Sequence, residues 1–445
     1  MVITKKRYKI RNKTKTSSRN KTKTSSRNKT NKKTLKNNGI TQYLPSHLTH
    51  LSHLNTTDSK HLSKRLIPLI KLKGGRYIDK GGFGCVITPA IPCSKADKNL
   101  DESVSKVIRD PDDDIKNEII ISNILKSIDK EQQYFITYNK YCYLTELPEG
   151  RTDITDVKYK DADFSRFSLK DARQKKTMDN KFCDVDLNKK PVNIIMPYAG
   201  YSLSAIMKSN RKNQGLLPKM NQMFVDGLKK YFKHLLIGLR KMHENRLVNR
   251  DIKEKNITVA LDANTNSLKL RYIDFGLTQF LTSDFESDLE NISSDGTYFY
   301  MSPEIFISRT ITKYPGETKS YHMRKIMQKV ENDLLVALRR IDENVLLDDI
   351  EGKIESLYEK ILNLFINGKL APVFFGTAKN KFNGYLQKAD VYALGLTIYD
   401  CLYTYSKIDV KRNKNLRSLL LNMLNLNADK RYNVEQCLSH EYFRN

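Results

Sequence analysis

The chain has 445 residues, enough for two or three compact units, because domains usually run about 100 to 200 residues. It carries a formal net charge of +28, and apolar residues make up only 39% of it. No apolar run approaches the roughly 20 residues of a membrane-spanning helix, and the N-terminus lacks the apolar core of a signal peptide. We therefore expect no integral membrane segment.

The N-terminal segment is strongly basic. Residues 1–40 contain fifteen Lys or Arg and no Asp or Glu, and one octapeptide occurs at both 11–18 and 19–26. Too little apolar surface is present to offset chain entropy, so we predict a disordered tail at 1–40 and a linker at 41–70. The tail suits nucleic acid, an acidic partner or an anionic membrane surface, although a solvated tail without a dedicated partner is the alternative.

The six cysteines show no CxxC pair and no metal-ligand spacing with the histidines. We therefore expect neither structural zinc nor a disulfide framework, and a reducing cytoplasm or nucleus is the natural compartment.

The first half of the folded part favours strands. The sequence predicts them at 70–72, 76–78, 85–88, 103–108 and 193–196. One helix is expected from Pro111, where a proline and three acids suit a helix N-terminus and Ile115, Ile119 and Ile124 share one face.

Helices are predicted to dominate from Leu203 onward. Residues 223–242 have apolar side chains at helical spacing, and residues 323–366 carry two more such periods that we expect to form a helical hairpin, with Asn367 and Gly368 as a stop. A small strand-rich region followed by a larger helical region is an α+β arrangement.

A glycine-rich loop, Gly81-Gly82-Phe83-Gly84-Cys85-Val86, lies between two expected strands, where its backbone could fold closely over phosphates. Alone it fits an ordinary turn as well. Lys106 follows in an apolar strand, where burial is costly without an anionic partner, and Glu118 on the next helix can supply one. A structural salt bridge would explain that pair equally.

Two further stretches decide between these alternatives: Asn249-Arg250-Asp251-Ile252-Lys253-Glu254-Lys255-Asn256, and Ile273-Asp274-Phe275-Gly276. They make three oxygen-bearing side chains available, from Asp251, Asn256 and Asp274. Phosphoryl transfer needs a carboxylate to orient the attacking hydroxyl and hard oxygen ligands for Mg²⁺.

With Ser302-Pro303-Glu304, Lys388-Ala389-Asp390 and Arg431 downstream, these stretches resemble the signature series of the eukaryotic-type protein kinases. The resemblance covers nearly everything after the tail. It implies the two-lobed protein-kinase fold, with a small β-rich N-lobe and hinge at 71–200 and a larger helical C-lobe at 201–445. ATP and Mg²⁺ would bind between the lobes.

The resemblance also implies a role for each matching residue. Lys253 and Thr297 follow the pattern of serine/threonine kinases. The expected site comprises Asp251 as catalytic base and Lys253 as the group that steadies the transferred phosphoryl; Gly81, Gly82, Phe83, Gly84, Val86 and Lys106 with its partner Glu118 for the nucleotide; Asn256 and Asp274 for the metal; and a Glu304–Arg431 pair that anchors the segment before Glu304.

The sequence departs from the family pattern in three ways. Asn249 replaces a histidine that packs beneath the Phe of Asp-Phe-Gly, so we expect a looser or permanently altered core there, and Ser122 stands where an apolar residue is usual. The chain is also longer than a minimal kinase, with a charged surface insertion expected at about 129–190 and a helical one at about 310–385. The second insertion either docks a partner or is a decoration without a ligand.

The expected function is that of a serine/threonine protein kinase, which transfers the γ-phosphate of ATP to Ser or Thr hydroxyls of protein substrates. The alternatives are a catalytically weak pseudokinase scaffold that recruits nucleic acid or an acidic partner through its tail, and a small-molecule kinase, against which Ser302-Pro303-Glu304 and Arg431 argue. Because Arg250 is retained, a phosphate on Thr282, Ser283, Ser287, Ser293 or Ser294 could order the neighbouring segment.

The loop at 81–86 is also similar to that of kinases of large DNA viruses. A viral member of the family would be found in the host cell or the virion.

Overall fold

The computed structural model describes residues 76–80, 84–94, 97, 100–108, 113–144, 189–209, 215–262, 265–281, 296–341, 347–370, 375–405 and 410–444. All of them belong to one compact unit, Pro45–Asn445. The predicted tail, the linker and the strand at 70–72 lie outside the described residues, as do Gly81, Gly82 and Phe83.

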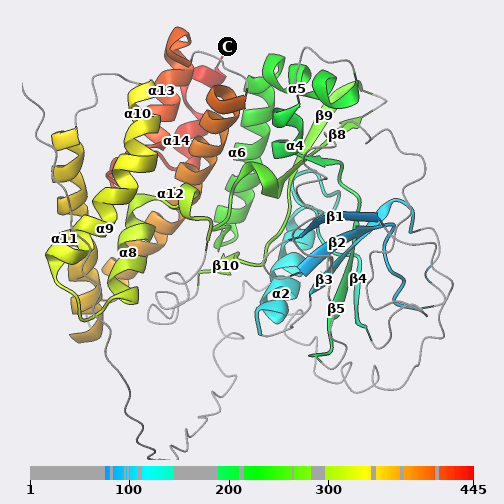
Figure 1. Ribbon diagram of the computed structural model, residues 1–445, viewed down its shortest axis with the longest axis horizontal. Coiled ribbons are helices and arrows are strands. Elements are labelled where there is room, and N and C mark those ends of the chain that lie inside the picture. The colour runs from blue at the N-terminus through cyan, green and yellow to red at the C-terminus, as the bar shows by residue number, and fades with distance from the viewer. Residues whose placement is uncertain are drawn as a thin grey trace, which may run out of the picture. The chain divides into compact units, whose positions relative to one another are not determined.

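The strand-rich region is a five-stranded antiparallel sheet in the order β1-β2-β3-β5-β4 (Figure 1). The strands span β1 Arg76–Lys80, β2 Gly84–Thr88, β3 Ser103–Ile108, β4 Lys140–Tyr143 and β5 Val192–Pro197. Four of them confirm predicted strands. The edge strand β4 instead falls in the segment assigned to a surface insertion, so at least residues 140–143 of that segment belong to the sheet; residues 145–188 lie outside the described residues.

Helix α2, Asp113–Ile128, packs on this sheet. Its Ile115 lies in one buried cluster with Ile108 of β3 and with Val192 and Ile194 of β5. The predicted apolar face of this helix is therefore the face that meets the sheet. Ile115 lies about one helical turn before Glu118. Its contact with the sheet therefore holds the Glu118 side chain near β3, the strand that carries Lys106.

The expectation of no disulfide framework is contradicted by the structure, in which Cys85, Cys93 and Cys142 are disulfide-bonded. Cys93, in the loop after β2, is bonded to Cys142 of β4, with the two Cα atoms 5.7 Å apart. Both side chains lie in a small apolar cluster with Ala90 and Ile195. Sequence spacing did not reveal the pair because the two residues are 49 positions apart and meet only through the sheet. The pattern of cysteines therefore no longer supports the expectation of a reducing compartment.

The second region is mainly helical, which confirms the α+β arrangement (Figure 1). Its helices span α4 Leu203–Lys208, α5 Leu216–Asp226, α6 Leu228–Glu244, α8 Pro303–Lys313, α9 Lys319–Lys329, α10 Leu335–Ile341, α11 Leu347–Leu370, α12 Phe375–Asp400, α13 Lys414–Met423 and α14 Val434–Leu438. Short strands accompany them: β6 Tyr201–Ser202, β7 Leu247–Val248, β8 Ile257–Asp262, β9 Ser267–Tyr272 and β10 Gln279–Phe280. None of the helices that the structure describes is long and apolar enough to cross a membrane.

The predicted helix at 223–242 is divided at Gly227 into α5 and α6. A Cβ at this position would lie 2.5 Å from the ring of Tyr231, so only glycine leaves room for that ring. The apolar spacing of residues 223–242 is regular on both sides of the break and could not show it.

The predicted helical hairpin at 323–366 consists of more pieces than expected. Helix α9 runs through one π-helical turn, Val330–Leu334, into α10, and α11 follows. Both α9 and α11 pack against α8. The predicted stop at Asn367 and Gly368 is wrong, because α11 continues to Leu370. A glycine inside a helix costs only about 1 kcal/mol relative to alanine, which neighbouring residues can offset.

Candidate active site

A buried lysine joins the two regions. Lys106 Nζ in β3 donates to Glu118 Oε1 of α2 at 2.6 Å and to Asp274 Oδ1, beyond β9, at 2.8 Å. The Lys106 and Glu118 side chains are 14% and 13% exposed, whereas Asp274 is 45% exposed. Residues far apart in the sequence therefore form one charged cluster, and its Asp274 side is open to a ligand.

The charges of this cluster are stable at neutral pH. Burial by itself lowers the pKa of Lys106, but the carboxylates of Asp274 and Glu118 outweigh it and raise the pKa. The Lys106 charge in turn lowers the pKa of Asp274 below its ordinary 3.8. A lowered acid pKa stabilises the fold above the unfolded value, and that stability is lost only as the pH falls through the folded pKa. The cluster therefore weakens in acid below about pH 4 and not near pH 7.

Asp251 lies at the centre of a second network and is 8% exposed. Its Oδ1 accepts a hydrogen bond from Thr297 Oγ1 at 2.6 Å. Its Oδ2 accepts from Lys253 Nζ at 2.7 Å and from Asn256 Nδ2 at 2.9 Å. Lys253 Nζ also donates to Thr297 Oγ1 at 2.7 Å. Three donors, one of them cationic, thus hold the Asp251 carboxylate in one orientation. A general base needs such a fixed orientation toward its substrate.

The backbone around Asp251 is held by Asp390 of α12. The N–H groups of Asn249 and Arg250 donate to the two Asp390 carboxylate oxygens at 2.7 and 2.9 Å. Arg250 has φ = 68° and Asp274 has φ = 63°, a left-handed conformation that costs a residue with a Cβ about 1 to 3 kcal/mol unless its surroundings enforce it. The sequence singled out Asp390 as part of a signature, but this contact 140 residues away was not predicted.

Two residues that depart from the family pattern, Asn249 and Ser122, each accept a hydrogen bond from a nearby backbone N–H. Asn249 Oδ1 accepts a hydrogen bond from the Asp251 N–H at 3.0 Å, so this side chain braces the loop that carries the base. Ser122 Oγ accepts from the Tyr138 N–H at 3.2 Å. Phe275 is 3% exposed and packs edge-on against Phe135, with ring centroids 6.1 Å apart. The core around Phe275 is therefore packed, where the sequence led us to expect looseness.

The pair expected between Glu304 and Arg431 is present and fully buried. Arg431 Nη1 lies 2.5 Å from Glu304 Oε1, and Nη2 lies 2.9 Å from Oε2. Ser302 Oγ donates to the same carboxylate at 2.7 Å. This fork fixes the start of α8 to the C-terminal part of the chain.

The residues expected to hold Mg²⁺ have suitable chemistry. Asn256 uses its amide nitrogen to donate to the Asp251 carbonyl and carboxylate, at 3.0 and 2.9 Å, which leaves its amide oxygen for a cation. Asp274 adds an ionised, half-exposed carboxylate. Amide and carboxylate oxygens are the hard ligands that Mg²⁺ prefers.

The nucleotide loop is described only in part. Gly84 begins β2, and Val86 of that strand pairs with Lys106 of β3. The expected nucleotide residues Val86 and Lys106 are therefore neighbours, and the strand that leads out of the loop runs beside the lysine.

Comparisons with known proteins place these residues in a family. Residues 181–320 match a family model described as the protein kinase domain, and this range includes Asp251, Asn256 and Asp274. Residues 181–320 of the chain are therefore similar to a protein kinase domain. The α+β architecture, strand-rich before the hinge and helical after it, is that of this kinase domain.

Several curated protein kinases are similar to this chain. It is 32% identical over 79 residues to serine/threonine-protein kinase CAK1 of Saccharomyces cerevisiae, a match that covers 17% of the chain and 22% of that protein. It is 24% identical over 254 residues to cyclin-dependent kinase E-1 of Arabidopsis thaliana, covering 56% and 49%, and 27% identical over 184 residues to serine/threonine-protein kinase nekl-2 of Caenorhabditis elegans, covering 38% and 47%. The chain thus spans half or less of the length of these relatives. They do not bear on the resemblance to viral kinases, which stays a prediction.

Replacing Lys106 with Met in this chain is expected to weaken ATP binding by about 10- to 150-fold, the loss of one charge-assisted hydrogen bond worth about 1.5 to 3 kcal/mol. Isothermal titration calorimetry with ATP and Mg²⁺ measures the change. Lys126→Met removes an exposed lysine from α2 and serves as the control. Equal affinities for the two variants would show that Lys106 does not hold the nucleotide.

Proposed function

We propose that this kinase transfers the γ-phosphoryl group of ATP to Ser or Thr hydroxyls of protein substrates. The observation that carries this proposal is the contact of Asp251 with both Lys253 and Thr297, beside the Lys106–Asp274 pair. A scaffold that only binds partners needs neither a carboxylate held in one orientation, as Asp251 is, nor a lysine in contact with it, as Lys253 is.

Each of these groups has a part in the reaction. Asp251 orients the attacking hydroxyl and accepts its proton, while Lys253 faces the negative charge that develops on the transferred group. Lys106 binds the phosphates of ATP and is kept in place by Glu118. Asn256 and Asp274 would hold Mg²⁺, which supplies positive charge to the phosphate oxygens when bound. Thr297 donates to Asp251 and accepts from Lys253, so its hydroxyl bridges the base and the cation, which also contact each other directly.

The test is transfer of labelled phosphate from ATP to a mixed set of basic and acidic proteins, with autophosphorylation included. We expect label on Ser and Thr, and we expect its loss when EDTA removes Mg²⁺. ATP binding without transfer to any protein would favour the pseudokinase scaffold, and transfer to small metabolites alone would favour a small-molecule kinase.

Two proposals concern residues outside the described ranges. The basic segment 1–40 would bind nucleic acid or an acidic partner, which filter binding at increasing salt can measure. A phosphate on Thr282, Ser283, Ser287, Ser293 or Ser294 would bind Arg250 and raise activity. Mass spectrometry of the purified kinase, before and after phosphatase, tests the second proposal; full activity without phosphate in this segment would refute it.

The helical insertion contacts the turn that carries Thr297 and Tyr298. Lys329 at the end of α9 is 6% exposed, and its Nζ lies 4.7 Å from the ring centroid of Tyr298 and 5.4 Å from that of Phe306. The two rings meet edge to face at 5.0 Å. Tyr298 directly follows Thr297, so α9 braces the turn that delivers the Thr297 hydroxyl to Asp251.

Lys329→Met, which keeps the apolar stem, is expected to lower kcat/KM for a protein substrate by about 2- to 30-fold, because a cation–π contact is worth about 0.5 to 2 kcal/mol. Steady-state kinetics with a fixed peptide substrate measures it. Lys325→Met is the matched control, since this exposed lysine of α9 lies over Tyr321 and not over the turn. A decrease of the same size in both variants would mean that Lys329 acts only through helix stability.

A further inference from the structure

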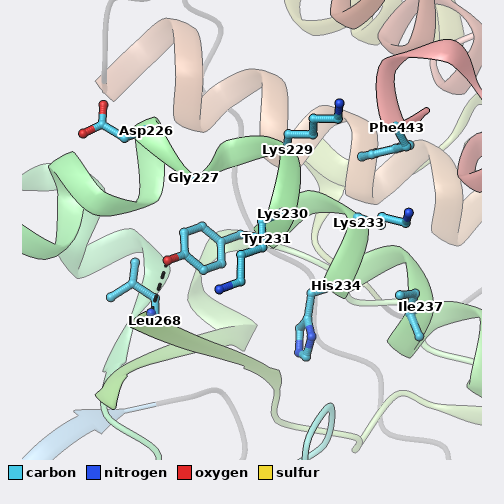
Figure 2. Close-up of a pocket in the computed structure, with 10 residues that line it drawn as sticks. All are labelled: Asp226, Gly227, Lys229, Lys230, Tyr231, Lys233, His234, Ile237, Leu268 and Phe443. Carbon is cyan, nitrogen blue, oxygen red and sulfur yellow. Dashed lines mark hydrogen bonds between the residues drawn. The ribbon is translucent and has the colours of Figure 1, made fainter. Parts of the chain in front are cut away.

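A cavity of about 600 Å³ lies away from the residues of the candidate active site. It is formed where α5 meets α6, beside the first residues of β9 and the short C-terminal helix Glu441–Phe443 (Figure 2). Its volume is in the range of ligand pockets, about 300 to 1,000 Å³. None of the residues assigned to ATP, Mg²⁺ or catalysis lines it.

The wall formed by α6 is strongly basic. Lys229, Lys230 and Lys233 all line the cavity, and no ion pair joins any of them to a carboxylate among the described residues. The single acid in the lining, Asp226, accepts a hydrogen bond from Gln222 at 2.7 Å. Helix α6 itself contains no acid before Glu244. The cavity therefore presents three cationic side chains against one carboxylate, and an anionic ligand complements it.

The rest of the lining is apolar and fixed. Tyr231 is buried, and its hydroxyl accepts a hydrogen bond from the Leu268 N–H at 3.2 Å, as drawn in Figure 2. Phe443 packs edge-on against Phe232, with ring centroids 5.6 Å apart. Ile237 extends this surface along α6. A ligand that carried charge alone would leave the apolar part of the cavity in contact with water.

The helix that carries the lysines is held in place by His234. His234 also lines the cavity, and its Nε2 lies 3.0 Å from the Leu270 carbonyl oxygen and 3.2 Å from that of Gln133. Its ring stacks on Tyr134, with centroids 4.6 Å apart. Burial lowers the pKa of His234, so at neutral pH the positive charge of the cavity comes from the lysines. The basic wall is thus anchored and requires little rearrangement to bind.

We propose that this cavity docks an acidic peptide segment of a protein partner, with an aliphatic or aromatic side chain of that segment on Tyr231, Ile237 and Phe443 and its carboxylates on Lys229, Lys230 and Lys233. Nucleic acid matches the charge and not the apolar surface. The partner would be tethered at a distance from Asp251, and binding does not require phosphoryl transfer.

The test uses the full chain and a fluorescein-labelled octapeptide, Glu-Asp-Phe-Glu-Glu-Leu-Asp-Glu, with a benzophenone on the phenylalanine ring. Fluorescence anisotropy gives Kd, and photo-cross-linking followed by mass spectrometry locates the bound peptide. The location matters because the basic residues of 1–40 attract acidic peptides too. The pocket variant is Lys229→Glu/Lys233→Glu, and the control is Lys353→Glu/Lys414→Glu, which makes the same charge change at two exposed helical lysines.

We expect cross-links in residues 226–237 or at Phe443, and a Kd at least about tenfold weaker in the pocket variant than in the control, equivalent to 1.4 kcal/mol. A peptide with Ser in place of Phe and Leu should bind at least about fivefold more weakly. Cross-links confined to 1–40, or equal Kd values for the two variants, would overturn the proposal. Equal binding of the Ser peptide, or complete competition by a single-stranded oligonucleotide, would reduce the cavity to a general anion site and overturn it as well. Thermal unfolding of both variants establishes that they are folded.

Discussion

Asp251→Asn is expected to lower kcat for phosphoryl transfer by about 10²- to 10⁴-fold, the usual contribution of a positioned general base. The amide has nearly the same shape as the carboxylate and can still meet Thr297 and Asn256, but it cannot accept the proton of the attacking hydroxyl. It also removes the negative charge opposite Lys253, whose Nζ lies 2.7 Å from Asp251 Oδ2. Transfer of labelled phosphate under single-turnover conditions measures the chemical step.

The control for this experiment is Asp262→Asn, which alters a carboxylate of β8 that pairs with Lys269 at 2.9 Å near the surface. We expect this variant to keep kcat within about twofold, because Asp262 pairs with Lys269, whose side chain is 54% exposed, and accepts from the Thr265 N–H, and neither residue belongs to the candidate active site. The ATP affinity of Asp251→Asn should stay close to wild type, since Lys106 and not Asp251 is assigned to the phosphates. If Asp251→Asn retained wild-type kcat, the proposed base and the reading of the site would both be wrong.

Arg431→Met is expected to lower the free energy of unfolding by about 3 to 5 kcal/mol, the cost of leaving one partner of a buried ion pair without the other. Both side chains of the Glu304–Arg431 pair are 0% exposed, so water cannot replace the lost donors. Arg431 also donates to the Asn425 carbonyl at 2.9 Å, and its guanidinium lies 5.0 Å from the ring centroid of Tyr392. Chemical denaturation monitored by circular dichroism gives the free energy.

A double variant separates the ion pair from simple packing. Glu304→Leu/Arg431→Met removes both charges, and we expect it to be more stable than Arg431→Met alone, because no buried charge remains unpaired. Lys269→Met, at the surface pair with Asp262, should cost no more than about 1 kcal/mol. A double variant less stable than either single variant would show that the two residues act separately.

Most of the sheet could be predicted because each strand is a local signal. The strands at β1, β2, β3 and β5 follow short apolar runs, and the apolar face of α2 is regular. Strand β4 was missed because Lys140–Tyr143 has a single buried residue, Cys142, and stands in a charged context at the sheet edge. Similarly, the spacing of apolar residues does not reveal the break at Gly227, where a Cβ would lie 2.5 Å from the Tyr231 ring.

The candidate site also has a part that could be predicted from the sequence and a part that could not. Lys106, Asp251 and Asp274 could be named from motifs, since these are short stretches with fixed spacing. The hydrogen bonds that position them could not, because Thr297, which donates to Asp251, lies 46 residues away, and Asp390, which accepts from the Arg250 N–H, lies 140 residues away. The cavity beside α6 left no sequence signal at all, since lysines on a helix usually form a solvated face.

The contact of Asp390 with the loop that carries Asp251 has a consequence for the newly made polypeptide. Asp390 leaves the ribosome 140 residues after Arg250, so at about 5 to 20 residues per second the loop waits roughly 7 to 28 s for the carboxylate that holds it. Arg431 is made later still. We therefore expect a nascent chain that contains Lys106, Asp251 and Asp274 but not yet Asp390 to lack the contact that holds the loop around Asp251.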